Sequence, residues 1–306
     1  MATESPRPFL LPVGPSRLAA PAVVVPRSAR VPTGVPDFDY LTGGLPAGSV
    51  VLLFGSAGAG HQEFALTSAV HLMGRLDEPR IHPVHLGPAK GPFEYPEAVV
   101  YLSTSRSRDQ ILTEIRGAFD GTYPVVFERH LRFQDLSASY FADTLVPQSW
   151  SSVPSRLLSG APASISIPSD GPLRAVADAI DGVEPRQLVI FDSLTDLLVR
   201  RGIEASDLLA LVKGLRRHAK EWGGLVYLVL TEGVAPPAVE QAILDSVDGV
   251  LHFSWVASPS HSHRQRSMLI EKFLPVLARL PAEYLGRFVI QVSARSGLVT
   301  TQYERI

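Results

Sequence analysis

A glycine-rich turn at residues 55–60, with the sequence Gly-Ser-Ala-Gly-Ala-Gly, could hold an anion on its backbone amides. It follows the apolar run Val50–Phe54 and precedes a helix-like stretch from about His61, which is the strand–loop–helix context of a phosphate-binding loop. Glycines let the amides turn inward, and the helix N-terminus adds positive potential. The candidate anion-binding residues are Gly55, Ser56, Ala57, Gly58, Ala59, Gly60, His61 and Gln62.

The last two positions of this loop depart from the phosphate-loop pattern G-x-x-x-x-G-K-[ST]. The lysine of that pattern neutralises phosphate charge and its hydroxyl ligates magnesium, whereas this chain carries His61 and Gln62. Histidine is shorter than lysine and mostly neutral near pH 7. Gln62 offers a carbonyl oxygen on a longer side chain than the site is built for. Taken alone, the loop is explained equally well by an ordinary glycine-rich turn.

Asp192 ends another apolar run, Leu188–Asp192, as the Walker B aspartate does in P-loop enzymes. In such sites the aspartate holds magnesium, so Asp192 is a candidate magnesium ligand. An aspartate between a strand and a helix also caps the helix by accepting hydrogen bonds from its first amides. The sequence leaves both interpretations open.

The segment that precedes the loop, VPTGVPDFDYLTGGLPAGS, resembles the corresponding segment of KaiC-like members of the RecA superfamily. Those proteins carry a T-G-[IV]-P-x-[FL]-D element, a Gly-Gly turn and P-x-G-S before the strand and the P-loop. The matching residues are Thr33, Gly34, Pro36, Asp39, Gly43, Gly44, Pro46, Gly48 and Ser49. The resemblance covers roughly residues 31–306, is closest to archaeal stand-alone domains, and implies a RecA-like P-loop NTPase fold with a degenerate Walker A motif.

Two further elements of the family pattern are altered in this chain. KaiC-like ATPases have a glutamate pair after the second strand, where this chain has Ser105 and Arg106. They also place a Lys-x-Arg pair on a late strand that reaches a neighbouring subunit's nucleotide, where this chain keeps Lys272 but has Leu274. Because such charge-stabilising groups each contribute a factor of about 10³ or more to the rate, their joint loss predicts little or no ATP hydrolysis.

The alternation of buried strands and helices predicts an α/β fold with a mainly parallel central sheet flanked by helices. We expect antiparallel strands at the C-terminal end. Residues 1–30, rich in proline and alanine, are expected to form a flexible leader. Residues 31–306 are then one RecA/KaiC-like domain, with irregular insertions near 75–97 and 120–170. The aromatic residues of the second insertion suggest either that it packs against the domain or that it forms a surface for a partner.

Composition excludes several functions. The 306 residues include no cysteine, which removes disulfides and thiolate metal sites and fits a cytoplasmic protein. A net charge of −2 gives no footprint for nucleic acid, and no apolar run is long enough to cross a membrane. The basic residues of the stretch 213–220 are expected to form the solvated face of a helix. The histidine pairs at 82/85 and 261/263 are not expected to bind metal.

These observations predict a regulatory or signalling P-loop protein, archaeal and cytoplasmic, that binds a protein partner or itself. ATP and magnesium would bind weakly or not at all, and enzymatic activity is not expected. The alternative is an active ATP-binding RecA-like ATPase of DNA recombination or repair, in which His61 or Arg106 replaces the lysine. That alternative predicts magnesium-dependent ATP hydrolysis that requires Asp192.

Overall fold

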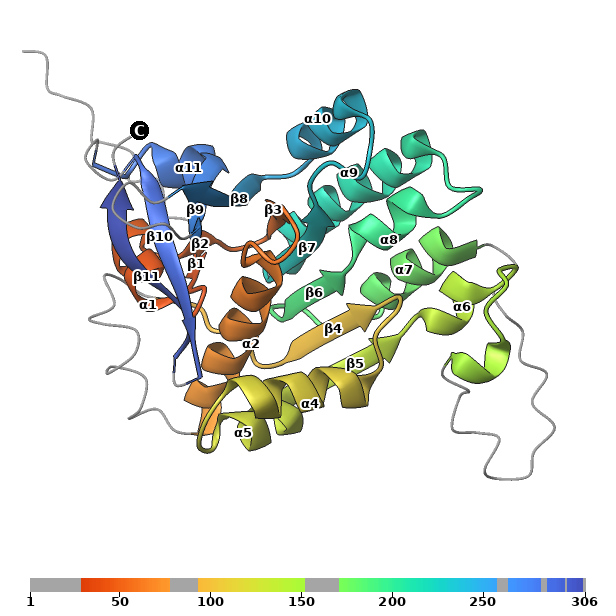
Figure 1. Cartoon of the computed structure of the whole chain (residues 1–306), viewed down its shortest axis with the longest axis horizontal. Helices are drawn as coiled ribbons and strands as arrows, with labels where there is room; N and C mark the ends of the chain where they lie inside the picture. Colours follow the sequence, from red (N-terminus) through yellow and green to blue (C-terminus); the bar gives the residue numbers. More distant parts are fainter. Residues whose placement is uncertain are drawn as a thin grey trace, which may run out of the picture.

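The computed structural model describes residues 29–77, 93–151, 171–257, 264–281, 285–294 and 296–304. Within these residues the main sheet has nine strands in the order β11-β10-β9-β8-β3-β7-β6-β4-β5 (Figure 1). The strands from β8 to β5 pair in parallel, and β8, β9, β10 and β11 pair antiparallel. Their bounds are β3 (Ser49–Gly55), β4 (Val99–Ser103), β5 (Leu131–Asp135), β6 (Leu188–Asp192), β7 (Leu225–Thr231), β8 (Gly249–Ala257), β9 (Arg264–Lys272), β10 (Arg287–Ser293) and β11 (Gly297–Glu304).

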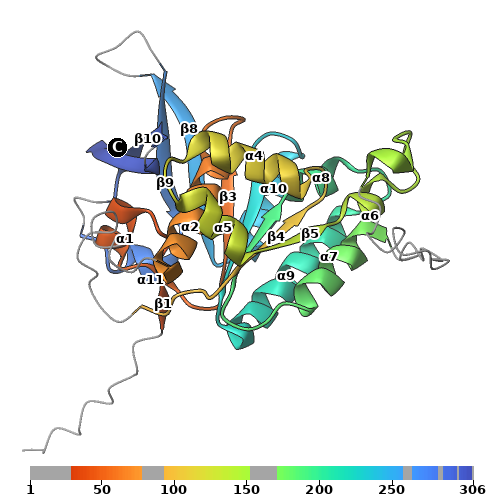
Figure 2. The ribbon, with the colours of Figure 1, turned by 90° about the horizontal axis from the view of Figure 1, so that it is seen from below.

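Helices cover both faces of this sheet. One face carries α1 (Pro36–Thr42), α2 (His61–Asp77), α4 (Arg108–Ala118), α5 (Tyr123–His130) and α11 (Leu274–Leu277). The other carries α7 (Gly171–Asp181), α8 (Leu194–Val199), α9 (Ala205–Trp222) and α10 (Pro237–Ser246). Figure 2 shows α4 and α5 on one side of the sheet and α7 and α9 on the other. The remaining elements are the small pair β1 (Arg30–Val31) and β2 (Leu45–Pro46), the helix α6 (Ser137–Phe141) and the 3-10 turn η1 (Gln148–Trp150).

The strand β3 connects the two hydrophobic cores. Its side chains alternate between the faces, so Val51 and Leu53 join the core under α2 while Val50, Leu52 and Phe54 join the core under α9. All five are at most 5% exposed. A strand buried on both faces must be apolar throughout, which is why this run predicts a parallel strand.

The segment before β3 that resembles the KaiC-like pattern is held by a buried hydrogen-bond network. The buried Asp39 carboxylate accepts hydrogen bonds of 2.8 Å from the amides of Thr33 and Gly34 and from the Thr33 hydroxyl. Gly34 has a φ of +79°, and a Cβ there would lie 3.1 Å from the carbonyl oxygen of Ser68 on α2. The Asp39 network therefore holds the turn at Thr33 and Gly34, and this turn packs against α2, where Nδ1 of His71 lies 2.7 Å from the carbonyl oxygen of Gly34.

The predicted fold class is confirmed, with one difference in the stretch 120–170. There the sequence indicates irregular structure, but residues 123–135 form α5 and β5, and β5 is an edge strand paired in parallel with β4. The burial pattern of β5 is only partly apolar, so its periodicity is weak, and pairing with β4 decides its conformation. The segments 1–28, 78–92 and 152–170 of the predicted leader and insertions lie outside the described residues.

We expect Leu53→Ala to lower the free energy of unfolding by about 2–5 kcal/mol, because it leaves a cavity at a fully buried position. Urea unfolding followed by circular dichroism measures the change. The matched control is Leu145→Ala, since Leu145 is fully exposed and its truncation should change stability by less than about 0.5 kcal/mol. Equal effects of the two substitutions would contradict the assigned core.

Candidate phosphate-loop site

The glycine-rich turn lies between β3 and α2 as predicted, and packing requires its glycines. A Cβ on Gly55 would lie 2.4 Å from the carbonyl oxygen of Phe253 on β8. Gly60 has a φ of +120°, and a Cβ there would lie 2.8 Å from Ile290 on β10. Gly58 has a φ of +72°, which side-chain-bearing residues rarely adopt. The loop conformation thus depends on neighbouring strands as well as on its own sequence.

The turn is closed by one hydrogen bond within the loop and is followed directly by the first amides of α2. The amide of Ala59 donates to the carbonyl oxygen of Ser56 at 3.0 Å and closes the turn. The helix α2 starts immediately afterwards, so the amides of its first residues, His61 and Gln62, have no acceptor within the helix. These amides and the helix dipole contribute positive potential to the turn independently of side-chain identity.

His61 does not replace the missing lysine charge. Its side chain is 3% exposed, its ring centroid lies 6.3 Å from that of Phe253, and Nδ1 has no hydrogen-bond partner among the described residues. Burial lowers the pKa of His61, although the nearby carboxylates of Glu63 and Asp192 act in the opposite direction. The imidazole is therefore neutral at pH 7. Gln62 is exposed at the start of α2.

Asp192 lies at the carboxyl end of β6 and its Oδ2 is already engaged. It accepts a hydrogen bond of 2.6 Å from the Tyr101 hydroxyl and forms an ion pair of 3.1 Å with Arg106. The carboxylate is 4% exposed. The helix α8 is capped instead by Ser193, whose hydroxyl accepts from the amide of Asp196. Capping therefore does not account for the aspartate at 192.

Arg106 occupies the end of β4, where the resemblance implies a glutamate. Its guanidinium bridges Asp192 on one side and Glu114 of α4 on the other. Next to it, the hydroxyls of Thr104 and Ser105 donate to Asp196. The carboxyl ends of β4 and β6 therefore form a network in which the carboxylates face arginine and hydroxyl donors.

Lys272 and Leu274, at the positions of the Lys-x-Arg pair, also differ from the family pattern in their contacts. The Lys272 ammonium donates to the carbonyl oxygens of Leu244 at 2.9 Å and Asp245 at 2.7 Å, and so caps the C-terminus of α10 in its own chain. Leu274, which stands where the resemblance implies arginine, is 78% exposed. Neither side chain contacts the loop at residues 55–62 in the described part of the chain.

Three residues that sequence reasoning missed bind the loop through their side chains: Glu232, Trp255 and Arg266. They lie directly after β7, on β8 and on β9, and no motif marks them. Only the pairing of β3 with β7 and β8, and of β8 with β9, brings these positions to the loop.

Glu232 also belongs to a charged group behind the loop. His252 of β8 lies with Nδ1 3.2 Å from Glu271 and with Nε2 3.5 Å from Glu232. The hydrogen bond to Glu271 and the charges of both carboxylates raise the pKa of His252 above 6.5, although burial opposes this. The imidazolium is thus favoured in the folded protein.

We expect His252→Gln to remove a pH-dependent part of the stability. A histidine whose pKa is raised on folding stabilises the fold fully below its unfolded pKa of about 6.5, and this contribution is lost as the pH rises through the higher folded value. The wild type should therefore lose melting temperature relative to the variant between pH 6 and 8, as measured by differential scanning fluorimetry. His218→Gln is the control, since no ion pair of His218 is found among the described residues; an identical pH profile for both variants would contradict the assignment.

Several other predicted features have structural roles. Arg216 and Lys220 on α9 form ion pairs of 2.9 and 3.1 Å with Asp248, whose carboxylate also accepts from the amide of Val50. The histidine pairs at 82/85 and 261/263 lie outside the described residues. Elsewhere in the described chain, no cluster of metal-binding side chains is found, and no helix there has the length and apolar character needed to span a bilayer.

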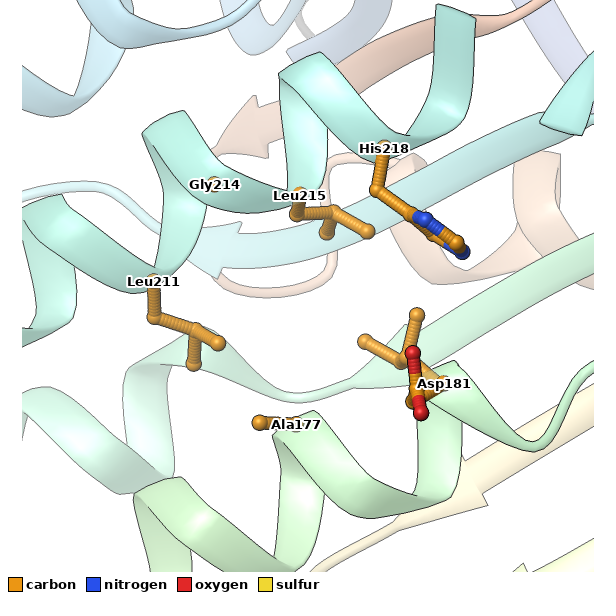
Figure 3. A pocket seen from close by; sticks show the side chains of 7 residues that line it. Ala177, Asp181, Leu211, Gly214, Leu215 and His218 are labelled. Atoms are coloured by element: carbon orange, nitrogen blue, oxygen red, sulfur yellow. The ribbon is translucent and has the colours of Figure 1, made fainter. Parts of the chain in front are cut away.

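A separate groove of about 270 Å³ lies between α7 and α9 (Figure 3). It is mainly apolar and does not include any residue of the phosphate loop. Its lining residues are Ala177, Ile180, Asp181, Leu211, Gly214, Leu215 and His218.

The sheet order, the position of the loop between β3 and α2, and the aspartate at the end of β6 define a RecA-like P-loop fold. Among solved structures, the chain is similar to a KaiC-like protein of Pyrococcus horikoshii, with a TM-score of 0.57 and 16% identity. It is equally similar to the flagellar accessory protein FlaH of Methanocaldococcus jannaschii, with a TM-score of 0.58 and 16% identity. Each alignment covers 90% of this chain and 100% of the other chain. No protein-family model and no curated protein matches the sequence.

Proposed function

We propose that this chain is a degenerate P-loop protein of RecA/KaiC-like type that acts through partner binding, in regulation or signalling, with weak or no ATP hydrolysis. The observation that carries the proposal is the ion pair of Arg106 with Asp192. It places a cation where the family pattern implies the water-activating glutamate. It also engages Oδ2, one of the two carboxylate oxygens of Asp192 that would otherwise be available for a metal-bound water.

The side chains at the positions of the magnesium ligands also support a protein with weak or no ATP hydrolysis. Mg²⁺ is bound in such sites by a P-loop hydroxyl and a carboxylate, and it requires oxygen ligands with strict octahedral geometry. Here Gln62 stands at the hydroxyl position and Asp192 faces Tyr101 and Arg106. These residues do not fit a resident magnesium ion, so we assign no reaction step to one.

The anion site itself is retained in part, because backbone amides and the helix dipole do not depend on side-chain identity. ATP would therefore bind weakly or not at all, through its phosphates and without magnesium. The accessory role of FlaH, which its name states, is consistent with a domain of this fold that works through partners. We extend this only as a proposal that a protein partner or a second copy of the chain is the target; nucleic acid and membrane are not proposed as partners.

We expect no ATP turnover above a no-enzyme control, even at high protein concentration and with DNA present, because the glutamate that would activate water and the lysine that would neutralise phosphate charge are both replaced. A coupled phosphate-release assay makes the measurement. Magnesium-dependent turnover that Asp192→Asn abolishes, and Asp181→Asn does not, would overturn the proposal and favour the alternative of an active RecA-like ATPase.

We expect His61→Lys combined with Gln62→Thr to restore nucleotide binding but not hydrolysis. The pair returns the charge and hydroxyl of the P-loop pattern, whereas Arg106 still blocks water activation. A ligand at about a hundred times its dissociation constant stabilises the fold by about 2.7 kcal/mol, so ATP should raise the melting temperature of the double variant by several degrees and that of the wild type by less. An equal rise in both proteins would show that the native loop binds ATP normally.

A further inference from the structure

Side chains from the β8–β9 hairpin bind the outer surface of the phosphate loop. The indole Nε1 of Trp255 donates to the carbonyl oxygen of Ala57 at 3.3 Å. The Nε of Arg266 donates to the carbonyl oxygen of Gly58 at 2.9 Å. Two successive peptide groups of the loop are therefore held by two donors from the same hairpin.

The two donors also support each other. The guanidinium carbon of Arg266 lies 5.0 Å from the ring centroid of Trp255, within the range of a cation–π interaction. The second guanidinium nitrogen lies 3.6 Å from a carboxylate oxygen of Glu63 in the first turn of α2. Arg266 thus connects the hairpin, the loop and the helix that follows it.

A third contact holds the start of the loop from the opposite neighbour. The Ser56 hydroxyl donates to Oε2 of Glu232 at 2.9 Å, and the amide of Glu232 donates to the carbonyl oxygen of Gly55 at 2.9 Å. Glu232 follows β7, whereas Trp255 and Arg266 come from β8 and β9. We call Glu232, Trp255 and Arg266 the loop clamp, because one of them binds each of the three consecutive residues 56, 57 and 58.

The clamp determines which way the loop amides point. In a planar trans peptide group the C=O and N–H bonds point in opposite directions. When the carbonyl oxygens of Ala57 and Gly58 turn outward to the hairpin, the amides of Gly58 and Ala59 turn inward. The amide of Ala59 donates a hydrogen bond of 3.0 Å to the carbonyl oxygen of Ser56, which closes the same turn from within.

We propose that Glu232, Trp255 and Arg266 are positioning residues that hold the phosphate loop in its anion-receptive shape when no ligand is bound. In this chain, the side chains of the loop clamp restrict the conformation of the phosphate loop. In a P-loop with its lysine, that residue and a bound phosphate would do this. The inference rests on the proposed function, in which the loop lacks its lysine and is not ordered by a bound nucleotide. It explains how the fold keeps its loop geometry independently of nucleotide.

The test is amide hydrogen exchange of the full chain in the absence of nucleotide. The amides of Ser56 and Ala59 are the reporters, since both donate hydrogen bonds that break when the loop opens. Arg266→Met keeps an unbranched side chain that reaches about as far as the arginine Nε, but removes the donors. We expect exchange at these two amides about fivefold faster, which corresponds to the loss of one net hydrogen bond of about 1 kcal/mol at about 1.4 kcal/mol per tenfold change.

The matched control is Arg264→Met, because Arg264 lies two residues away on the same strand, points to the same side and is exposed. Trp255→Phe is the second variant, with Trp150→Phe as its control; it keeps an aromatic ring but removes the N–H donor together with the second ring of the indole. Arg266→Lys should restore part of the protection, because one ammonium can bind either Gly58 or Glu63 but lacks the fork that binds both. Melting temperatures show whether each variant is folded.

Faster exchange confined to the loop in Arg266→Met and Trp255→Phe, with both controls unchanged, supports the proposal. Exchange in these variants equal to that of their controls, or unprotected Ser56 and Ala59 amides in the wild type, would overturn it. Because no nucleotide is present, ATP turnover found in the separate hydrolysis assay would reject the proposed function and leave the exchange result unaffected.

Discussion

The structure depends on the burial of β3 on both faces of the sheet. The five apolar side chains of β3 divide between the two cores. A change of strand register, or a rotation of the strand about its axis, would therefore remove apolar side chains from their core. This constraint fixes the point at which β3 ends, and there Gly55 lies against the backbone of β8. The chain must then turn sharply before α2 begins, and only glycine allows the required close approach and positive φ angles. The phosphate-loop geometry is in this sense a consequence of core packing.

The polar chemistry at the carboxyl ends of the strands has a different origin. A parallel sheet brings the ends of β4 and β6 together whatever residues stand there, so Arg106 and Asp192 become neighbours. In a buried position the carboxylate needs a charged or hydrogen-bonding partner, and Tyr101 and Arg106 supply both. The same topology that would assemble a catalytic centre from glutamate and aspartate here assembles a satisfied ion pair. The fold depends on packing throughout the sheet, whereas the chemistry at the strand ends depends on a few side chains.

The loop, the buried strands and the α/β class could be predicted from sequence because each depends on local patterns. Glycine spacing, apolar runs and the segment around Asp39 indicate them directly. The helix α5 and the strand β5 could not be predicted in the same way, because β5 is a half-exposed edge strand whose conformation is set by pairing with β4. The environments of His61 and Arg106, the two residues considered as replacements for the P-loop lysine, also became visible only in the structure. One side chain is buried and neutral, and the other is bound to Asp192 and Glu114.

The sequence by itself determined the elements whose residues are close together along the chain: the order of strands and helices, the position of the phosphate loop and the absence of its lysine and hydroxyl. Only the tertiary structure decided which side chains meet at that loop. Glu232, Trp255 and Arg266 are separated from residues 56–58 by more than 170 positions, and each follows or lies on a strand whose place in the sheet no local pattern specifies. Contacts between such distant residues depend on strand order and register, which are properties of the packed sheet as a whole.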